Sequence, residues 1–445
     1  MNKFNTSKLD LKELETELFR QLQEEYSEIM KKLLIDMDTE LMESRDKKCL
    51  RHVGKRNVQI DTIFGSVTFD RNYYLNRNTG EYVHLLDQQL NFNGASGASP
   101  FIEQLGIEMA IEGPSFRSAA DKLEKITGYR VVSHEWIRQK LLDISQPTKS
   151  DIISNRVLFV EVDGLHVSRQ RSHRKSKEEK IVAVHQGWSV NGERVSLTHK
   201  RHFHHETDEL FWEAFEHFLY DTFNYDPMVH LLVINGDQAS WIQDANDHFG
   251  ENVYVIVDRY HIAKEIRNIF RGHPRKNAIQ RAFRDYNVDQ LIIELNSVMG
   301  TLPSPELEEA AEKLLNQIQK NPDGFKDYRK WLEAHGIDTT GMRRMGNAES
   351  TMRVVAKRMK GGYSWSDLGT RQMMRGLISK YDRLPIQLFN GFGESKETED
   401  KQENKMSSKK QVRKAVRESI RNNVPYLMQS VGKPISQALR GLQGV

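Results

Sequence analysis

Three short apolar runs, each followed by an aspartate, constrain the fold of this chain more than any other feature. They are residues 157–162, 230–236 and 253–257, and they precede Asp163, Asp237 and Asp258. Their β-branched and aliphatic residues predict strands buried on both faces, with Gly164 as the turn after the first. Because α/β sheets bind ligands at the carboxyl ends of their strands, we expect the three aspartates to meet at one edge. For any one of them, capping of the following helix is the simpler alternative.

The composition is that of a folded, water-soluble protein. The chain has 445 residues, of which 38% are hydrophobic and 29% charged, and its net charge is +3. This length predicts about two to four domains. The single cysteine, Cys49, excludes an internal disulfide and a multi-cysteine zinc site. No signal-peptide core and no long apolar run occur, so we expect a cytoplasmic protein. No nucleotide-binding motif is present, so we expect no nucleotide cofactor.

The first 100 residues predict a helix, a hairpin and a linker. Residues 9–44 carry an apolar stripe that predicts one long helix, which either packs on the rest of the chain or pairs as a coiled coil. Alternating residues on both sides of Gly65 and Ser66 predict a β-hairpin with a tight turn there. Residues 93–100 are small and are expected to form a flexible linker.

Residues 101–143 predict a compact helical unit that resembles a helix-turn-helix. Gly128 is expected to end one helix and Ser133 to cap the next. The second helix would present Arg138 and Lys140 to DNA, although a small helical bundle without DNA contact fits the same pattern.

The central region predicts a mixed sheet of three antiparallel strands followed by two parallel ones. In chain order, we expect strands at 157–163, 180–188 and 193–199, a helix at 207–222, a strand at 230–236, a helix at 238–249 and a strand at 253–258. This is the element order of the ribonuclease H-like fold. Residues 259–345 are helical in pattern and are interpreted as an insertion.

The fold class is therefore α/β, with additional N-terminal and inserted parts. We assign a long helix to 1–50, a β-hairpin region to 51–95, a helix-turn-helix-like DNA-binding domain to 96–150, a ribonuclease H-like catalytic domain to 151–258 and 346–392, an all-α insertion to 259–345, and a charged linker with a basic tail to 393–445.

Asp163, Asp237 and Glu349 form the candidate catalytic and metal-binding triad. Carboxylates held together repel one another unless a cation compensates them, and oxygen ligands favour Mg²⁺, with Mn²⁺ as a substitute. Two such ions support in-line displacement at a phosphodiester. Asp258 and His261 can share one face at a helix start, as an accessory pair or as a helix cap with a partly buried histidine.

Two windows are strongly basic, which favours contact with a nucleic-acid backbone. Residues 264–284 contain seven Lys and Arg residues and one acidic residue. Residues 343–375 contain eight Lys and Arg residues and two acidic residues. The candidate DNA-binding residues in these windows are Arg267, Arg271, Arg275, Lys276, Arg353, Lys357 and Arg358. Trp365 either stacks on a base or lies in the core. The histidines at 199–205 match no zinc pattern and are expected at the surface or on DNA.

Several strings of residues resemble the DDE-type transposases of bacterial insertion sequences, nearest the ISLre group, which is related to the Mutator-like transposases. The most specific ones are residues 234–242, which read INGDQASWI, and 257–261, which read VDRYH. The resemblance also covers 161–164, 184–188 and 347–349.

This resemblance implies a Mg²⁺-dependent transposase that uses two ions. Such an enzyme cuts and joins double-stranded DNA at the terminal inverted repeats of its own element. The resemblance also assigns the triad to Asp163, Asp237 and Glu349, with Asp258 and His261 as accessory residues. A homodimer or higher oligomer on DNA is expected. Two alternatives stay open: a catalytically silent DNA-binding protein, and a metal-dependent nuclease without strand transfer.

Overall fold

The computed structural model describes residues 10–92, 94, 97–145, 155–170, 175–207, 209–237, 239–346 and 348–386. The side chains of residues 348–352 lie outside this description. The charged linker and basic tail predicted for residues 393–445 also lie outside it. The chain divides into two compact units. Of the described residues, those within 10–33, 58–69 and 97–386 belong to the first unit, and those within 34–57 and 70–94 belong to the second.

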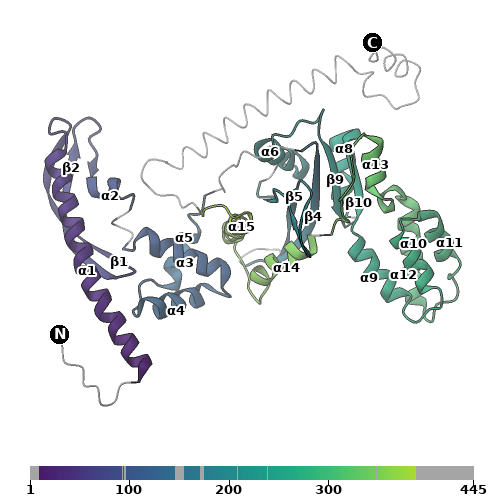
Figure 1. Cartoon of the computed structure of the whole chain (residues 1–445), viewed down its shortest axis with the longest axis horizontal. Helices are drawn as coiled ribbons and strands as arrows, with labels where there is room; N and C mark the ends of the chain where they lie inside the picture. The colour runs from purple at the N-terminus through teal and green to yellow at the C-terminus, as the bar shows by residue number, and fades with distance from the viewer. Residues whose placement is uncertain are drawn as a thin grey trace, which may run out of the picture. The chain divides into compact units, whose positions relative to one another are not determined.

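A five-stranded mixed sheet forms the centre of the first unit (Figure 1). Its order is β10-β9-β4-β5-β8, with strands β4 (Val157–Ser168), β5 (Ser176–His185), β8 (Arg201–His204), β9 (Leu231–Gly236) and β10 (Val253–Val257). Strands β4, β9 and β10 are parallel, and β4, β5 and β8 are antiparallel. The sequence-based expectation of three antiparallel strands followed by two parallel ones is therefore confirmed.

Two details of the predicted strands are wrong. Strand β4 does not end at Asp163 but continues to Ser168, because β5 pairs with it along its whole second half, and Gly164 lies within the strand opposite Lys180. The predicted strand 193–199 belongs to a separate two-stranded hairpin, β6 (Trp188–Asn191) and β7 (Arg194–Leu197). The third strand of the sheet is β8, which comes from the histidine-containing run.

Alternation along the strands divides the core between two faces. Leu158, Val160 and Val162 pack with the helices α6 (Phe211–Phe223), α7 (Ser240–Gln243) and α8 (Ala245–Phe249). On the other face, Val157 and Phe159 pack with Tyr328 and Leu332 of the helix α13 (Tyr328–Ala334) and with residues leading to α14. The aspartates extend the second face, since residues two apart in a strand point the same way.

The predicted insertion consists mainly of helices, as expected. It contains α9 (Arg259–Ile269), α10 (Lys276–Arg284), α11 (Val288–Asn296) and α12 (Pro305–Lys320), which bury their apolar stripes in a core of their own, and then α13. Two further helices follow, α14 (Ala348–Met359) and α15 (Asp367–Asp382). Both pack with the second half of β4 and with Ile181 of β5.

The predicted helix-turn-helix-like region forms α3 (Pro100–Glu112), α4 (Phe116–Thr127) and α5 (His134–Leu141). The hydroxyl of Ser133 accepts from the N–H of Trp136, so the predicted cap is confirmed. Gly128 ends α4 with a φ of 76°, a conformation that glycine adopts without steric cost.

Near the N-terminus, α1 (Leu11–Ser44) is followed by a three-stranded sheet of β1 (Leu50–Thr62), β2 (Gly65–Asn76) and β3 (Tyr82–Val83), and by the short helix α2 (Leu85–Gln89). The hairpin turn is Ile63–Phe64, not the predicted Gly65–Ser66, and Gly65 begins β2. In the second unit, Arg71 is buried and paired with Asp87. No helix among the described residues is both long and apolar enough to cross a membrane.

Candidate functional site

The strand register brings three aspartates to one level of the sheet. Strand β4 pairs with β9 at a constant offset from Val157↔Leu231 to Glu161↔Asn235, and that offset places Asp163 opposite Asp237. Strand β9 pairs with β10 up to Gly236↔Val257, which places Asp237 opposite Asp258. The N–H of Asp258 also donates to the carbonyl of Gly236 at 2.9 Å. Neighbouring strands lie about 4.8 Å apart, so the three carboxylates occupy one row.

Asp163 is the half-buried member of this row. Burial raises the pKa of its carboxyl to about 6, and the negative charges of Asp237 and Asp258 act in the same direction. The N–H of Gly164, which donates to Asp163 Oδ1 at 2.8 Å, and the charge of His261 lower that pKa only in part. Among the described residues, neither Asp163 nor Asp237 forms an ion pair with lysine or arginine. The negative charge of Asp163 is therefore incompletely compensated.

The other two aspartates differ in exposure and role. Asp237 is exposed, and its Oδ1 accepts from the N–H of Ala239 at 3.3 Å. Asp258 is buried and caps α9 by accepting from the N–H of Tyr260. Its Oδ2 lies 3.0 Å from Nδ1 of the half-exposed His261. Asp258 is therefore the helix cap that one alternative predicted, while His261 is exposed rather than partly buried and keeps contact with Asp258 through Nδ1.

Glu349 lies in the first turn of α14, and its side chain is outside the described residues. The backbone before it does approach the aspartates. The N–H of Gly346 donates to Glu161 Oε1 at 3.4 Å, and Glu161 is two residues before Asp163 on the same face of β4. Further along α14, Val355 and Met359 pack with Leu165 and Val167 of β4. These contacts bring the start of α14 to the row of Asp163, Asp237 and Asp258, which we call the carboxylate edge.

The residues present suit a divalent cation that needs few protein ligands. Among the described side chains, no group of three or more histidines, cysteines, aspartates or glutamates is spaced to enclose a metal ion. Asp163 and Asp237 supply hard oxygen atoms whose mutual repulsion a cation would relieve. Mg²⁺ commonly uses one or two carboxylates and keeps its remaining positions for water and phosphate oxygens.

A second polar row lies directly below the first, and the sequence interpretation missed it. Glu161 and Asn235 are paired in register, and each is 1% exposed. Neither side-chain polar atom of Asn235 has a hydrogen-bond partner among the described residues. The signal was available, because Glu161-Val162-Asp163 and Asn235-Gly236-Asp237 both place a polar residue two positions before the aspartate.

The candidate DNA-binding residues are found in different states. Arg267, Arg271, Arg353 and Lys357 are exposed and Lys276 is half-buried. Arg275 pairs with Glu294 at 2.9 Å, Arg138 with Glu135 at 2.6 Å, and Lys140 with Glu103 at 2.7 Å. Arg358 is buried among aromatic rings and donates to the carbonyl of Ala110 at 2.9 Å. Its placement corrects the prediction that it contacts DNA, since a buried guanidinium cannot reach a phosphate.

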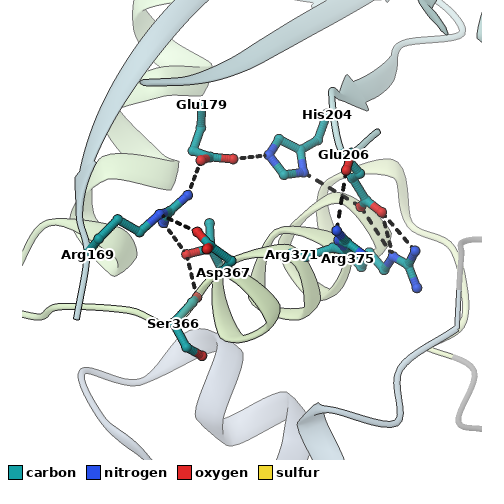
Figure 2. A network of polar contacts seen from close by, with 9 residues as sticks. Arg169, Glu179, His204, Glu206, Ser366, Asp367, Arg371 and Arg375 are labelled. Carbon is teal, nitrogen blue, oxygen red and sulfur yellow. Dashed lines mark hydrogen bonds and ion pairs between the residues drawn. The ribbon is translucent and has the colours of Figure 1, made fainter. Parts of the chain in front are cut away.

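The predicted surface histidines are wrong in two of four cases. His202 and His204 are buried in β8. Figure 2 shows His204 between two carboxylates, with Nε2 2.6 Å from Glu179 Oε2 and Nδ1 3.6 Å from Glu206 Oε1. Glu179 also pairs with Arg169, and Glu206 pairs with Arg375 at 2.8 Å. We call Arg169, Glu179, His204, Glu206 and Arg375 the buried ionic network.

This network has a structural role. Burial by itself would lower the pKa of His204, but the hydrogen bonds with Glu179 and Glu206 raise it above its usual value. Burial would likewise raise the pKa of both glutamates, and their cationic partners instead lower it. Arg375 lies on α15 and its partner Glu206 follows β8, so the network holds this helix against the β8 end of the sheet (Figure 2). Trp365 is buried in the adjoining core, as one of its two predicted roles required.

Comparisons with known proteins identify relatives without a known activity. A family model described as "Uncharacterised protein family (UPF0236)" matches residues 4–387. A UPF0236 protein of Caldanaerobacter subterraneus subsp. tengcongensis is 22% identical over 346 residues, which are 74% of this chain and 69% of the relative. A second one from the same organism is 22% identical over 312 residues, which are 68% of this chain and 62% of the relative. The name of the first relative combines eleven numbered designations that share one prefix. The name of the second relative combines four designations with the same prefix.

Proposed function

The chain belongs to UPF0236, an uncharacterised protein family, and we propose that it is a transposase that cleaves DNA and transfers strands with the help of two Mg²⁺ ions. The observation that carries this proposal is the row of Asp163, Asp237 and Asp258 on three neighbouring parallel strands. Its element order, a three-stranded meander, a helix and two parallel strands, supports a ribonuclease H-like catalytic domain. The sequence resemblance to DDE-type transposases points to the same chemistry.

Each residue at the edge has a distinct task in this proposal. Asp163 and Asp237 supply oxygen ligands, and Glu349 at the start of α14 completes the set. Divalent ions bound there would activate a water and stabilise the leaving oxygen of a phosphodiester. Asp258 holds Nδ1 of His261. The exposed imidazole ring of His261 can then contact a phosphate or accept a proton at Nε2. Arg353 and Lys357 are exposed on α14, and in this proposal they bind the DNA strand beyond Glu349.

The names of the relatives favour a mobile element. A single protein name that joins eleven labels from one organism is expected when nearly identical genes recur in one genome. Repeated copies are what transposition produces, whereas an ordinary nuclease or a DNA-binding regulator is usually encoded once. This observation favours strand transfer over the two alternatives that the sequence left open.

The test is Mn²⁺-supported nicking and joining of labelled DNA that carries the ends of the element. Glu349→Gln should reduce nicking by at least about 10²-fold, the scale on which loss of one preorganised electrostatic group acts. Glu333→Gln and Asp338→Asn are matched controls, since both carboxylates are exposed and already accept a hydrogen bond from Thr339 and Thr340 respectively. DNA binding by each variant serves as the folding control.

Three outcomes separate the candidate functions. Nicked and joined products support a transposase. Nicked products without joining identify a nuclease, and DNA binding without either product identifies a catalytically silent protein. Normal nicking by Glu349→Gln together with collapse of either control would remove Glu349 from the site.

A further inference from the structure

A hollow of about 660 Å³ opens at Glu161, two residues before Asp163 on β4, and both apolar and cationic side chains line it. One wall is apolar and consists of Trp188, Val195 and Leu197 of the β6–β7 hairpin. The rest of the lining contains Met342, Met345 and three arginines, of which Arg329 is paired with Asp327 at 2.6 Å, whereas Arg343 and Arg344 are exposed. The volume lies within the range of sites for small organic ligands, about 300–1,000 Å³.

The hairpin wall is an unusual surface. Trp188 pairs with Leu197 and Val190 with Val195, so that one face of the hairpin is apolar and the other carries Ser189 and Ser196. Val195 lines the hollow and is 39% exposed, so its side chain is accessible to a ligand there. The Trp188 ring is held in place, with centroid distances of 4.7 Å to Phe159 and 5.1 Å to His185. A fixed indole with branched aliphatic neighbours suits a flat, apolar ligand surface.

The cationic part of the lining suits phosphate. Arg343 and Arg344 are exposed and precede α14 by a few residues. The one carboxylate in the lining, Glu161, is 1% exposed at the floor and accepts the N–H of Gly346. Arg344 also lines a second hollow of about 400 Å³ together with Arg259, Arg267 and Arg284. That second lining contains no carboxylate among the described residues, and Arg259 directly follows Asp258.

We propose that the first hollow binds one unpaired nucleotide of the DNA strand at the carboxylate edge. Its base would lie against the hairpin wall, and its phosphates would lie on Arg343 and Arg344. A paired base cannot enter, because it is stacked inside the duplex and must leave the stack to reach a pocket. The proposal rests on the proposed function, since it names the form of DNA that the same site accepts.

The test compares two DNA molecules in metal-free buffer, so that cleavage plays no part. One is a blunt duplex, and the other is the same duplex with a three-nucleotide single-stranded overhang. Fluorescence anisotropy should show that the full chain binds the overhang DNA about 5- to 160-fold more tightly, the range that stacking of one base contributes. Val195→Glu should abolish this preference and leave the affinity for blunt duplex nearly unchanged, whereas Arg343→Glu should weaken binding of the overhang DNA more than binding of the blunt duplex.

Two variants are matched controls. Val190→Glu changes the same hairpin at a residue that is 58% exposed and does not line the hollow, and it should keep the overhang preference. Arg281→Glu removes an exposed arginine of α10 that lines neither hollow, and it should weaken both DNA molecules equally.

The outcomes distinguish the two proposals. Equal binding of both DNA molecules by the unmodified chain, or equal behaviour of Val195→Glu and Val190→Glu, would overturn the nucleotide site and leave the proposed transposase intact. An overhang preference without any nicking in Mn²⁺ would support the nucleotide site and overturn the proposed catalytic function. Failure to bind either DNA would overturn both.

Discussion

Acidic and histidine side chains gather at two places on the central sheet, and they are neutralised at only one of them. In the buried ionic network at β5 and β8, Glu179 and Glu206 are each paired with an arginine and with His204, and their pKa values are lowered in spite of burial. At Asp163, which lies within β4 beside the ends of β9 and β10, burial and neighbouring carboxylates raise the pKa of the carboxyl.

This difference teaches how a functional cluster is told from a structural one. Buried charges that serve the fold are paired, because an unpaired charge in a low-dielectric interior is costly. Carboxylates that repel one another at a half-exposed edge do not stabilise the fold, and their arrangement makes physical sense when a cation or a substrate completes it. Residue type alone does not distinguish the two places.

The largest effect is expected from breaking the compensated cluster. Glu206→Gln should destabilise the fold by about 3–5 kcal/mol, because it leaves the buried Arg375 without its counter-charge and leaves His204 with Glu179 alone. Chemical denaturation measures the loss. Asp367→Asn is the matched control, since Asp367 pairs with Arg169 but has a side chain that is 72% exposed, and its loss should cost at most about 1 kcal/mol. Equal losses in both variants would show that burial does not decide the contribution.

The opposite result is expected from neutralising the uncompensated cluster. Asp163→Asn should lower Mn²⁺-supported nicking by at least about 10²-fold and leave the melting temperature unchanged or raised, because like-charge repulsion with Asp237 has gone. Asp289→Asn, an exposed change on α11, controls for the loss of one surface charge. A clear drop in melting temperature for Asp163→Asn would make this aspartate a structural residue and would break the comparison.

The two clusters should also differ in how pH affects stability. The pKa of His204 is raised in the folded state, so its contribution is full below the unfolded value of about 6.5 and is lost as pH rises through the folded value. The pKa values of Glu179 and Glu206 are lowered, so their contributions are present above about 4.5 and are lost as pH falls. The stability difference between the unmodified chain and His204→Gln, measured by urea unfolding, should therefore narrow as the pH is raised above neutrality. A difference independent of pH would mean that His204 contributes by packing alone.

The smallest expected effect concerns the reach of DNA beyond the carboxylate edge. Arg271→Glu combined with Lys276→Glu should weaken DNA binding and reduce the slope of log affinity against log salt by about one unit for each lost phosphate contact. Both residues belong to the helical insertion, and Arg271 is exposed. Titrations at several salt concentrations measure the slope. An unchanged slope would confine the DNA to the sheet edge and exclude this part of the insertion.

Much of the fold could be predicted because local patterns carried it. Apolar periodicity identified the long helix and the helical insertion, and Ser133 and Gly128 marked the helix ends where the structure has them. The hairpin turn at 63–64 and the continuation of β4 past Asp163 were missed, because strand pairing fixes them rather than turn residues. A strand that gains a partner continues, whatever residue lies in its middle.

The sequence by itself determined which side chains are available at the edge, since polar residues that follow or interrupt apolar strands at a period of two must share one face. It also determined the offsets that a parallel pairing would need to align Asp163, Asp237 and Asp258. Only the tertiary structure decided which charges are compensated. His204 and Arg358 look in the sequence like surface groups for DNA, yet the first is buried between carboxylates and the second among aromatic rings. Pairing and burial depend on residues up to some 250 positions away, such as Ala110 for Arg358, and no local pattern contains that information.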